Sequence, residues 1–381
     1  MEMTLSPAQE ELVAAASSLQ EKLAAGYRER ETARRIEPEL RREIGALGLI
    51  GPELPSEYGG RDLPRLTSGL IVEQIARGDF NVGYLQVVGS LVGQILASNA
   101  TPETARKYVP RITSGEGIVG IGLSEPEAGS DAGNPKMTAR KDGDSWVING
   151  VKSMSFATQA EATVIFARTD PEAGRGRGIS AFVIDLDSPG VRIEPVEDTG
   201  TRAVERGLIH CEGVRVPAAH LLGNEGAGFT QVMQGFDFSR ALIGLQCLGT
   251  AEVTVEETWD YVSHREAFDQ PLSKFQGVSF PLAEAETQLT AARLLCLRTL
   301  HLKDTGQNHT KEAAMCKWWA PKVAHDAITQ CLLLHGQFGY RTDKPIEQRM
   351  RDVLGLQIGD GTAQIMKLII ARQSAGRQFA P

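Results

Sequence analysis

The chain has 381 residues, which is long for a single hydrophobic core and favours two or three domains. Its 41% hydrophobic and 23% charged residues are typical of a soluble globular protein, and a net charge of −8 argues against a nucleic-acid-binding surface. The five cysteines are widely spaced, form neither a metal-binding pattern nor a disulfide framework, and fit a reducing compartment. We find no apolar run that could span a bilayer and no signal-peptide core, so we expect a cytoplasmic protein without a membrane partner.

Helical patterns dominate the first 116 residues. Ser6, Pro7 and Gln9 form a capping-box pattern that predicts the start of a helix, and apolar residues then recur at helical spacing. Residues 52–60 are rich in proline and glycine and predict a loop. Further helices are expected over residues 36–47, 70–76 and 82–98, and from Thr101 onward.

Between residues 117 and 228 the pattern changes to short β-rich runs separated by turns. Short strands with regular spacing predict a small barrel or sandwich. Arg175 and Arg177 lie between two of these runs, and without interleaved aromatic residues they indicate a solvated loop rather than a nucleic-acid site. The expected strands cover residues 118–123, 146–148, 163–167, 179–184, 191–196 and 208–216.

The remainder of the chain is helical again. Four long helices predict a bundle. We therefore expect a mainly α protein with a central β domain, divided into an N-terminal helical domain (1–116), a middle β-barrel domain (117–228) and a C-terminal four-helix bundle (229–381). The expected bundle helices cover residues 229–264, 281–303, 310–335 and 346–372, the last with a break near Gly359.

The most specific motif covers residues 121–131, with the sequence Ile-Gly-Leu-Ser-Glu-Pro-Glu-Ala-Gly-Ser-Asp. A strand would end here in a rigid turn, because Pro126 cannot join a sheet ladder and Gly129 permits unusual backbone angles. Local chemistry alone fits an ordinary turn capped by an aspartate. The full string resembles the signature of the acyl-CoA dehydrogenase family, in which this loop lies between a flavin and a thioester.

The order of helices, β domain and bundle is similar to that family over essentially the whole chain. The resemblance implies an FAD-dependent enzyme that removes two hydrogens from adjacent carbons of an acyl-CoA. In the family a carboxylate takes the α-proton, and the β-hydrogen leaves as hydride to N5 of the flavin. The resemblance also implies an electron-transfer flavoprotein as the electron acceptor, and a homotetramer.

By the same resemblance, the catalytic base is Asp360. The family pattern is Glu-Gly-Thr, whereas this chain has Asp360-Gly361-Thr362. Aspartate is shorter by one C–C bond, about 1.5 Å, so we expect a closer substrate or a cyclic or branched acyl group such as cyclohexanecarbonyl-CoA. Some related families use aspartate, namely dehydrogenases of alicyclic acyl-CoAs and nitroalkane oxidase. The alternative is that Asp360 only caps a helix. Ser239 occupies the family's other base position and cannot serve as a base.

The resemblance assigns further residues to FAD. Ile121, Leu123 and Ser124 match positions that meet the isoalloxazine ring. Phe156 stands where the family has a hydroxyl that bonds flavin N5, so Ser155 or Thr158 would have to replace it. The other matched positions are Met154, Ser155 and Phe156 beside the ring, Arg265, Phe268 and Gln276 at the FAD diphosphate of a neighbouring subunit, Leu333, Gly336 and Gln337 in a turn at the adenosine diphosphate, and Thr362 and Gln364.

A second group of residues is assigned to the substrate by the resemblance. Ser130 matches a residue near the pantetheine, and Asp237 and Arg240 match residues near the adenosine or pantetheine of CoA. Gly361 lies beside the base, where a backbone amide bonds the thioester carbonyl in the family. Because Asp237 and Arg240 are three residues apart on an expected helix, a solvated surface pair is the alternative.

Three other functions stay open at this point. A flavin oxidase of a small carbon acid, similar to nitroalkane oxidase, would consume oxygen and need no CoA contacts. A non-catalytic flavin- or CoA-binding relative, including the DNA-associated kind, would be expected to carry a basic C-terminal extension, whereas this chain is acidic. A carrier protein could also take the place of CoA in the substrate.

Overall fold

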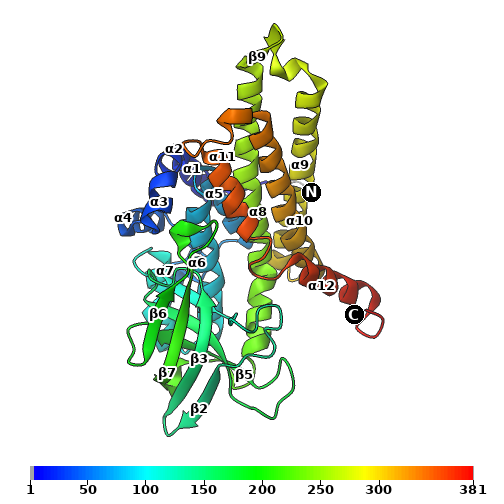
Figure 1. Ribbon diagram of the computed structural model, residues 1–381. Helices are drawn as coiled ribbons and strands as arrows, with labels where there is room; N and C mark the ends of the chain where they lie inside the picture. The colour runs from blue at the N-terminus through cyan, green and yellow to red at the C-terminus, as the bar shows by residue number, and fades with distance from the viewer. Residues whose placement is uncertain (1–3, 381) are drawn as a thin grey trace.

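The computed structural model describes residues 4–380, and its N-terminal part is helical (Figure 1). Ser6 and Gln9 form the expected capping box: the Ser6 amide donates to Gln9 Oε1 at 3.0 Å, and the Gln9 amide donates to Ser6 Oγ at 3.4 Å. A short 3₁₀ turn, Ser56–Tyr58, interrupts the loop expected over residues 52–60. The helices are α1 (Pro7–Ser18), α2 (Gln20–Ala25), α3 (Tyr27–Ala33), α4 (Pro38–Ala46), α5 (Arg65–Gly78), α6 (Phe80–Asn99) and α7 (Pro102–Thr113).

Helix α6 is the most apolar of these segments. Among residues 4–380 it alone is long and apolar enough to cross a membrane, but 83% of its apolar window is buried inside the protein. A mostly buried helix of this kind is a core helix. The expectation that the chain holds no apolar run of sufficient length was therefore too strict, although the burial explains why α6 is apolar.

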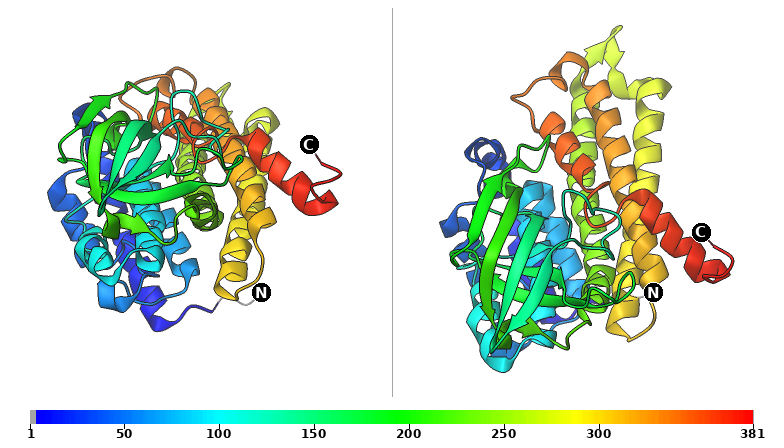
Figure 2. Two further views of the ribbon diagram at one scale, coloured as in Figure 1. Left: turned by 90° about the horizontal axis from the view of Figure 1, so that it is seen from below. Right: turned by 60° about the horizontal axis from the view of Figure 1, so that its bottom comes forward.

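The middle part of the chain forms one eight-stranded sheet with the strand order β6-β7-β3-β2-β4-β5-β8, and β1 pairs in parallel with β4. The expected strands are confirmed, and β2 and the short β8 are additional ones. Figure 2 shows the sheet against the N-terminal helices, and one hydrophobic core is shared between them. The strands are β1 (Val119–Gly122), β2 (Thr138–Asp142), β3 (Ser145–Met154), β4 (Ala162–Arg168), β5 (Ile179–Asp185), β6 (Val191–Pro195), β7 (Gly207–Pro217) and β8 (Leu221–Leu222).

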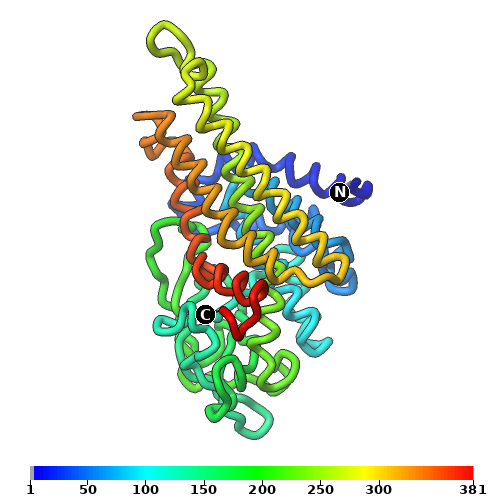
Figure 3. The backbone as a smooth tube through the Cα atoms, turned by 90° about the vertical axis from the view of Figure 1, so that its right-hand side faces the viewer, coloured from blue at the N-terminus to red at the C-terminus, as the bar shows by residue number. Residues whose placement is uncertain are grey.

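The C-terminal part is a helix bundle built around α8, which runs from beside the sheet to the opposite end of the molecule (Figure 1). The tip of α8 and the start of α9 project beyond the other helices (Figure 3) and carry a small hairpin of β9 (Glu266–Ala267) and β10 (Gln270–Pro271). The break expected near Gly359 separates α11 from α12. The fold class is thus confirmed. The bundle helices are α8 (Gly228–His264), α9 (Gln276–Asp304), α10 (Thr310–Leu334), α11 (Pro345–Gly355) and α12 (Ala363–Ala375).

One buried carboxylate joins all three parts of the chain. Asp352, on α11, accepts hydrogen bonds from the Tyr27 hydroxyl at 2.6 Å and from the Asn81 side-chain amide at 2.9 Å. Its other oxygen accepts from the backbone amide of Thr201, in the β-rich part, at 2.5 Å. Burial raises the pKa of Asp352 to about 7. Three donors from three separate segments converge on this single side chain.

Candidate active site

A cavity of about 630 Å³ lies where the sheet meets the helices. Its walls come from α6, the ends of β1 and β3, the first turns of α8, and the segment between α11 and α12. The structure therefore brings together segments that are far apart in the sequence. The residues assigned from the sequence that line this cavity are Ile121, Leu123, Ser124, Ser130, Met154, Ser155, Arg240, Asp360, Gly361 and Thr362.

The loop that follows β1 is held by a buried ion pair. Lys152 Nζ donates to Glu125 Oε1 at 2.8 Å and to the carbonyl of Leu123 at 3.0 Å. The other contacts of the Glu125 carboxylate are the backbone amides of Lys136 and Met137, at 2.6 and 3.0 Å. Both charged side chains are almost fully buried, and burial lowers the pKa of Lys152 while Glu125 opposes that shift. This pair fixes the cavity-facing loop to β3, and neither residue was assigned a role from the sequence.

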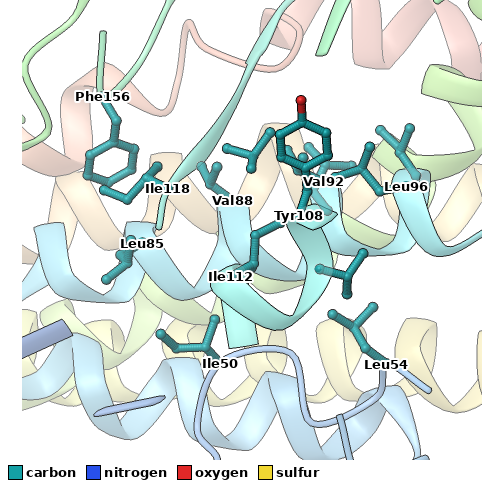
Figure 4. Packing of buried hydrophobic residues seen from close by; sticks show 14 of the residues in the cluster. Ile50, Leu54, Leu85, Val88, Val92, Leu96, Tyr108, Ile112, Ile118 and Phe156 are labelled. Atoms are coloured by element: carbon teal, nitrogen blue, oxygen red, sulfur yellow. The ribbon is translucent and has the colours of Figure 1, made fainter. Parts of the chain in front are cut away.

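The end of β3 forms the second wall. Ser155 faces the cavity, and its Oγ donates to the Tyr84 hydroxyl at 3.5 Å. Phe156 has a left-handed backbone (φ 60°), and its ring is buried in the hydrophobic core beside Ile118 and Val88 (Figure 4). Phe156 therefore does not line the cavity, contrary to its assigned position beside the flavin. The Thr158 hydroxyl bonds Glu205, and the serines of this segment that line the cavity are Ser153 and Ser155.

Asp360 lies in the turn between α11 and α12, with a left-handed backbone (φ 54°). Within residues 4–380 its carboxylate has no hydrogen bond and no ion pair with another side chain. Burial raises the pKa of Asp360, and the positive charges of Lys317 and Arg240 act in the opposite direction. Thr362, not Asp360, caps α12, because its Oγ1 accepts from the Ile365 amide. The interpretation of Asp360 as a simple helix cap is therefore wrong.

The pair of Asp237 and Arg240 is not a solvated surface pair. The Arg240 side chain is only 4% exposed, and its Nη1 donates to Asp237 Oδ1 at 2.8 Å. The hydroxyl of Thr310 donates to the second Asp237 oxygen at 2.6 Å, which ties α8 to the start of α10. Arg240 lines the cavity, and burial lowers its pKa. An arginine that is buried and cavity-facing is placed to meet an anionic or strongly polar group.

The remaining assigned residues lie elsewhere. Gln364 is exposed on α12, away from the cavity lining. At the tip, the guanidinium of Arg265 lies 6.0 Å from the centre of the Phe338 ring, so the hairpin and the turn after α10 form one surface. That surface contains large exposed side chains, including Phe268 at 89% and Leu333 at 64% exposure. The assigned residues at this tip, none of which lines the cavity, are Arg265, Phe268, Gln276, Leu333, Gly336 and Gln337.

The cavity suits a flavin ring in its chemistry. Apolar side chains of Ile121, Leu123 and Met154 alternate with the hydroxyls of Ser124 and Ser155 along one wall. A flavin has an apolar dimethylbenzene side and a polar pyrimidine edge, which such a wall can meet together. When bound, FAD supplies a hydride acceptor.

The chain thus combines N-terminal helices, a β-sheet and a C-terminal helix bundle, with the Asp360 carboxylate on the wall of a cavity between them. The chain belongs to the acyl-CoA dehydrogenase family. The N-terminal domain of acyl-CoA dehydrogenases matches residues 6–116, the middle domain residues 120–214 and the C-terminal domain residues 226–375. The family binds FAD, so the enzyme is an FAD-dependent oxidoreductase.

Individual relatives agree with this assignment. The mitochondrial short-chain specific acyl-CoA dehydrogenase of Rattus norvegicus is 37% identical over 334 residues, which are 87% of this chain and 81% of that protein. The structure of butyryl-CoA dehydrogenase from Megasphaera elsdenii superposes with a TM-score of 0.93 at 30% identity, covering 98% of this chain and 99% of that chain. A chain in the structure of the electron transferring flavoprotein of Acidaminococcus fermentans gives 0.95 at 32% identity, covering 98% and 100%.

Proposed function

We propose that this protein dehydrogenates the α,β bond of a small acyl-CoA, with Asp360 as the base that takes the α-proton. The observation that carries the proposal is the free carboxylate of Asp360 on a cavity wall, close in space to the family loop at residues 121–124. A base must have an accessible lone pair, and an ion pair in direct contact would occupy it. The β-hydrogen would leave as hydride to the bound FAD.

The acyl group that we propose is short, or compact because it is branched or cyclic. Tyr84 lines the cavity, and burial, followed by the charge of Asp360, raises the pKa of its phenol. We therefore infer that the large Tyr84 ring lies near the reacting end of the cavity, where it would restrict the length of the acyl group. The shorter reach of aspartate calls for a substrate carbon close to Asp360, and the rat relative is named for short-chain substrates.

Replacing Tyr84 tests the size limit directly. We expect Tyr84→Ala to raise kcat/KM for an eight-carbon acyl-CoA relative to a four-carbon one by at least about tenfold, since one methylene in an apolar pocket changes selectivity by that order. Steady-state kinetics with a series of acyl-CoAs measures the ratio. Tyr84→Phe keeps the ring and should keep the wild-type ratio. An unchanged ratio in Tyr84→Ala would show that another wall limits the chain length.

The pH dependence of the reaction follows from the environment of Asp360. Because its pKa is raised, the carboxylate form appears only above the ordinary aspartate range. The rate of flavin reduction by substrate should therefore rise with pH through this raised pKa. Anaerobic stopped-flow measurements over the pH range in which the protein stays folded would show this rise of the rate, which we call the pH limb. A rate that falls as pH rises in this range would contradict the assignment of Asp360 as the base.

The electron acceptor that we propose is an electron-transfer flavoprotein, and the assembly a homotetramer. Support for an assembly comes from the exposed apolar tip, where the residues assigned to the FAD diphosphate lie far from this chain's own cavity. These residues could meet FAD only in a second copy of the chain.

The test of the whole proposal is an anaerobic titration of the purified flavoprotein with straight, branched and cyclic acyl-CoAs. Loss of the long-wavelength flavin absorbance with a small acyl-CoA is the expected result. No bleaching with any thioester, while FAD is bound, would exclude the dehydrogenase. Oxygen consumption with a small carbon acid would then point to an oxidase.

A further inference from the structure

A second buried lysine lies behind the candidate base. Lys317, on α10, has no solvent exposure and shares a face with the buried residues Ala313, Ala320 and Ala324. A lysine on such an apolar face needs hydrogen-bond acceptors. Its Nζ donates to the backbone carbonyl of Leu356 at 2.6 Å and to that of Gly361 at 3.2 Å.

Along the chain, one of these two carbonyls precedes Asp360 and the other follows it. Leu356 ends α11, and Gly361 directly follows Asp360 in the chain. The ammonium group therefore ties together both ends of the short segment that carries the carboxylate. This segment needs support, because Asp360 has a positive φ angle of 54°, which is unfavourable for a residue other than glycine.

The hydrogen bonds of Lys317 also determine how its charge acts. The ammonium group bonds backbone carbonyls and not the Asp360 carboxylate, so it stabilises the ionised form without occupying the oxygen that would receive a proton. Burial lowers the pKa of Lys317 to about 8, so the group is still largely protonated at neutral pH. The other groups that interact electrostatically with Lys317 or Asp360 are Arg240 and Cys247 from α8 and Tyr84 from α6.

We propose that Lys317 is a positioning residue for the reaction, which holds the Asp360 segment in place and sets a positive charge close to the carboxylate. This inference rests on the proposed function, in which Asp360 is the base. It assigns a role in the reaction to a residue on α10, a helix that is absent from the cavity lining among residues 4–380.

The test compares Lys317→Met with Lys322→Met. Methionine keeps the apolar volume and removes the charge, and Lys322 is an exposed lysine on the same helix, paired with Asp326. In Lys317→Met the pH limb of flavin reduction should move upward by about one unit, since a nearby opposite charge shifts a carboxylate by that order. The rate below the limb should fall about tenfold and partly recover above it. Lys322→Met should match the wild type.

Other results of these experiments distinguish a purely structural role of Lys317 from an effect of its charge on Asp360. A uniform loss of rate with an unmoved limb would mean a structural role only, and would overturn the proposal. Lys317→Arg keeps the charge and should leave the limb close to its wild-type position, so a shift as large as that of methionine would also overturn it. Failure of both variants to give folded flavoprotein, while Lys322→Met folds, would mark Lys317 as structural.

A separate variant, Asp360→Asn, tests the proposed function itself. If Asp360→Asn still reduces flavin at a near-wild-type rate, Asp360 is not the base and the proposed function fails. If Asp360→Asn is inactive and Lys317→Met keeps the wild-type pH limb, only the inference about Lys317 fails.

Discussion

Asp360→Asn is expected to lower the rate of flavin reduction by an acyl-CoA by about 10³-fold or more, because a positioned general base contributes up to about 10⁴-fold. The amide keeps the size of the side chain but has no basic lone pair for the α-proton. The carboxylate makes no hydrogen bond within residues 4–380, so its loss should leave the fold and the flavin content unchanged. Single-turnover anaerobic stopped-flow with a saturating acyl-CoA measures this step without the electron acceptor.

Two variants control this experiment. Asp360→Glu keeps a carboxylate but extends it by about 1.5 Å, so it should retain far more activity and should improve straight-chain substrates relative to compact ones. Asp142→Asn makes the same chemical change at an exposed hairpin and should behave as the wild type. A rate for Asp360→Asn within tenfold of the wild type would show that another group takes the proton.

Glu125→Gln is expected to cost about 3–5 kcal/mol in the free energy of unfolding, because it leaves the buried Lys152 charge without its partner. The same change weakens the backbone contacts that hold the loop after β1. Bound FAD should therefore be lost at lower urea concentration than in the wild type. Urea unfolding followed by circular dichroism and by flavin fluorescence measures both effects.

The matched control is Glu39→Gln, which removes the same charge from an exposed pair with Arg42 and should leave the free energy of unfolding close to that of the wild type. A double variant, Glu125→Leu with Lys152→Met, removes both buried charges and should be less destabilised than Glu125→Gln alone. Equal stability of Glu125→Gln and the wild type would mean that the pair is not buried as described.

Regular patterns in the sequence predicted most of the fold. The capping box at Ser6 and the apolar run of α6 are local signals, and local signals suffice for helices. Strand β2 was missed because, of its five residues, only Ala139 is buried, so it has no alternating pattern to detect. Its place in the sheet depends on pairing with β3, a contact that a single sequence does not show.

The candidate site was predictable where residues belong to one contiguous motif, as in the loop at 121–131. The sequence did not show that the ring of Phe156 lies away from the cavity. Its positive φ turns the chain after β3, and phenylalanine is not a residue type that predicts such a turn. Lys317 and Lys152 were missed for a different reason, although a signal existed: each is a lysine at a position where the pattern of its helix or strand predicts a buried apolar residue.

The convergence of three segments on Asp352 has a consequence for how the protein unfolds. The hydroxyl of Tyr27, the side-chain amide of Asn81 and the backbone amide of Thr201 would all lose their acceptor if α11 separated from the rest of the protein. Each donor left buried and unpaired costs about 1–3 kcal/mol. Melting of α11 alone therefore carries a penalty in both the N-terminal helices and the β-rich part. Such coupling favours a single cooperative transition over stepwise loss of separate domains.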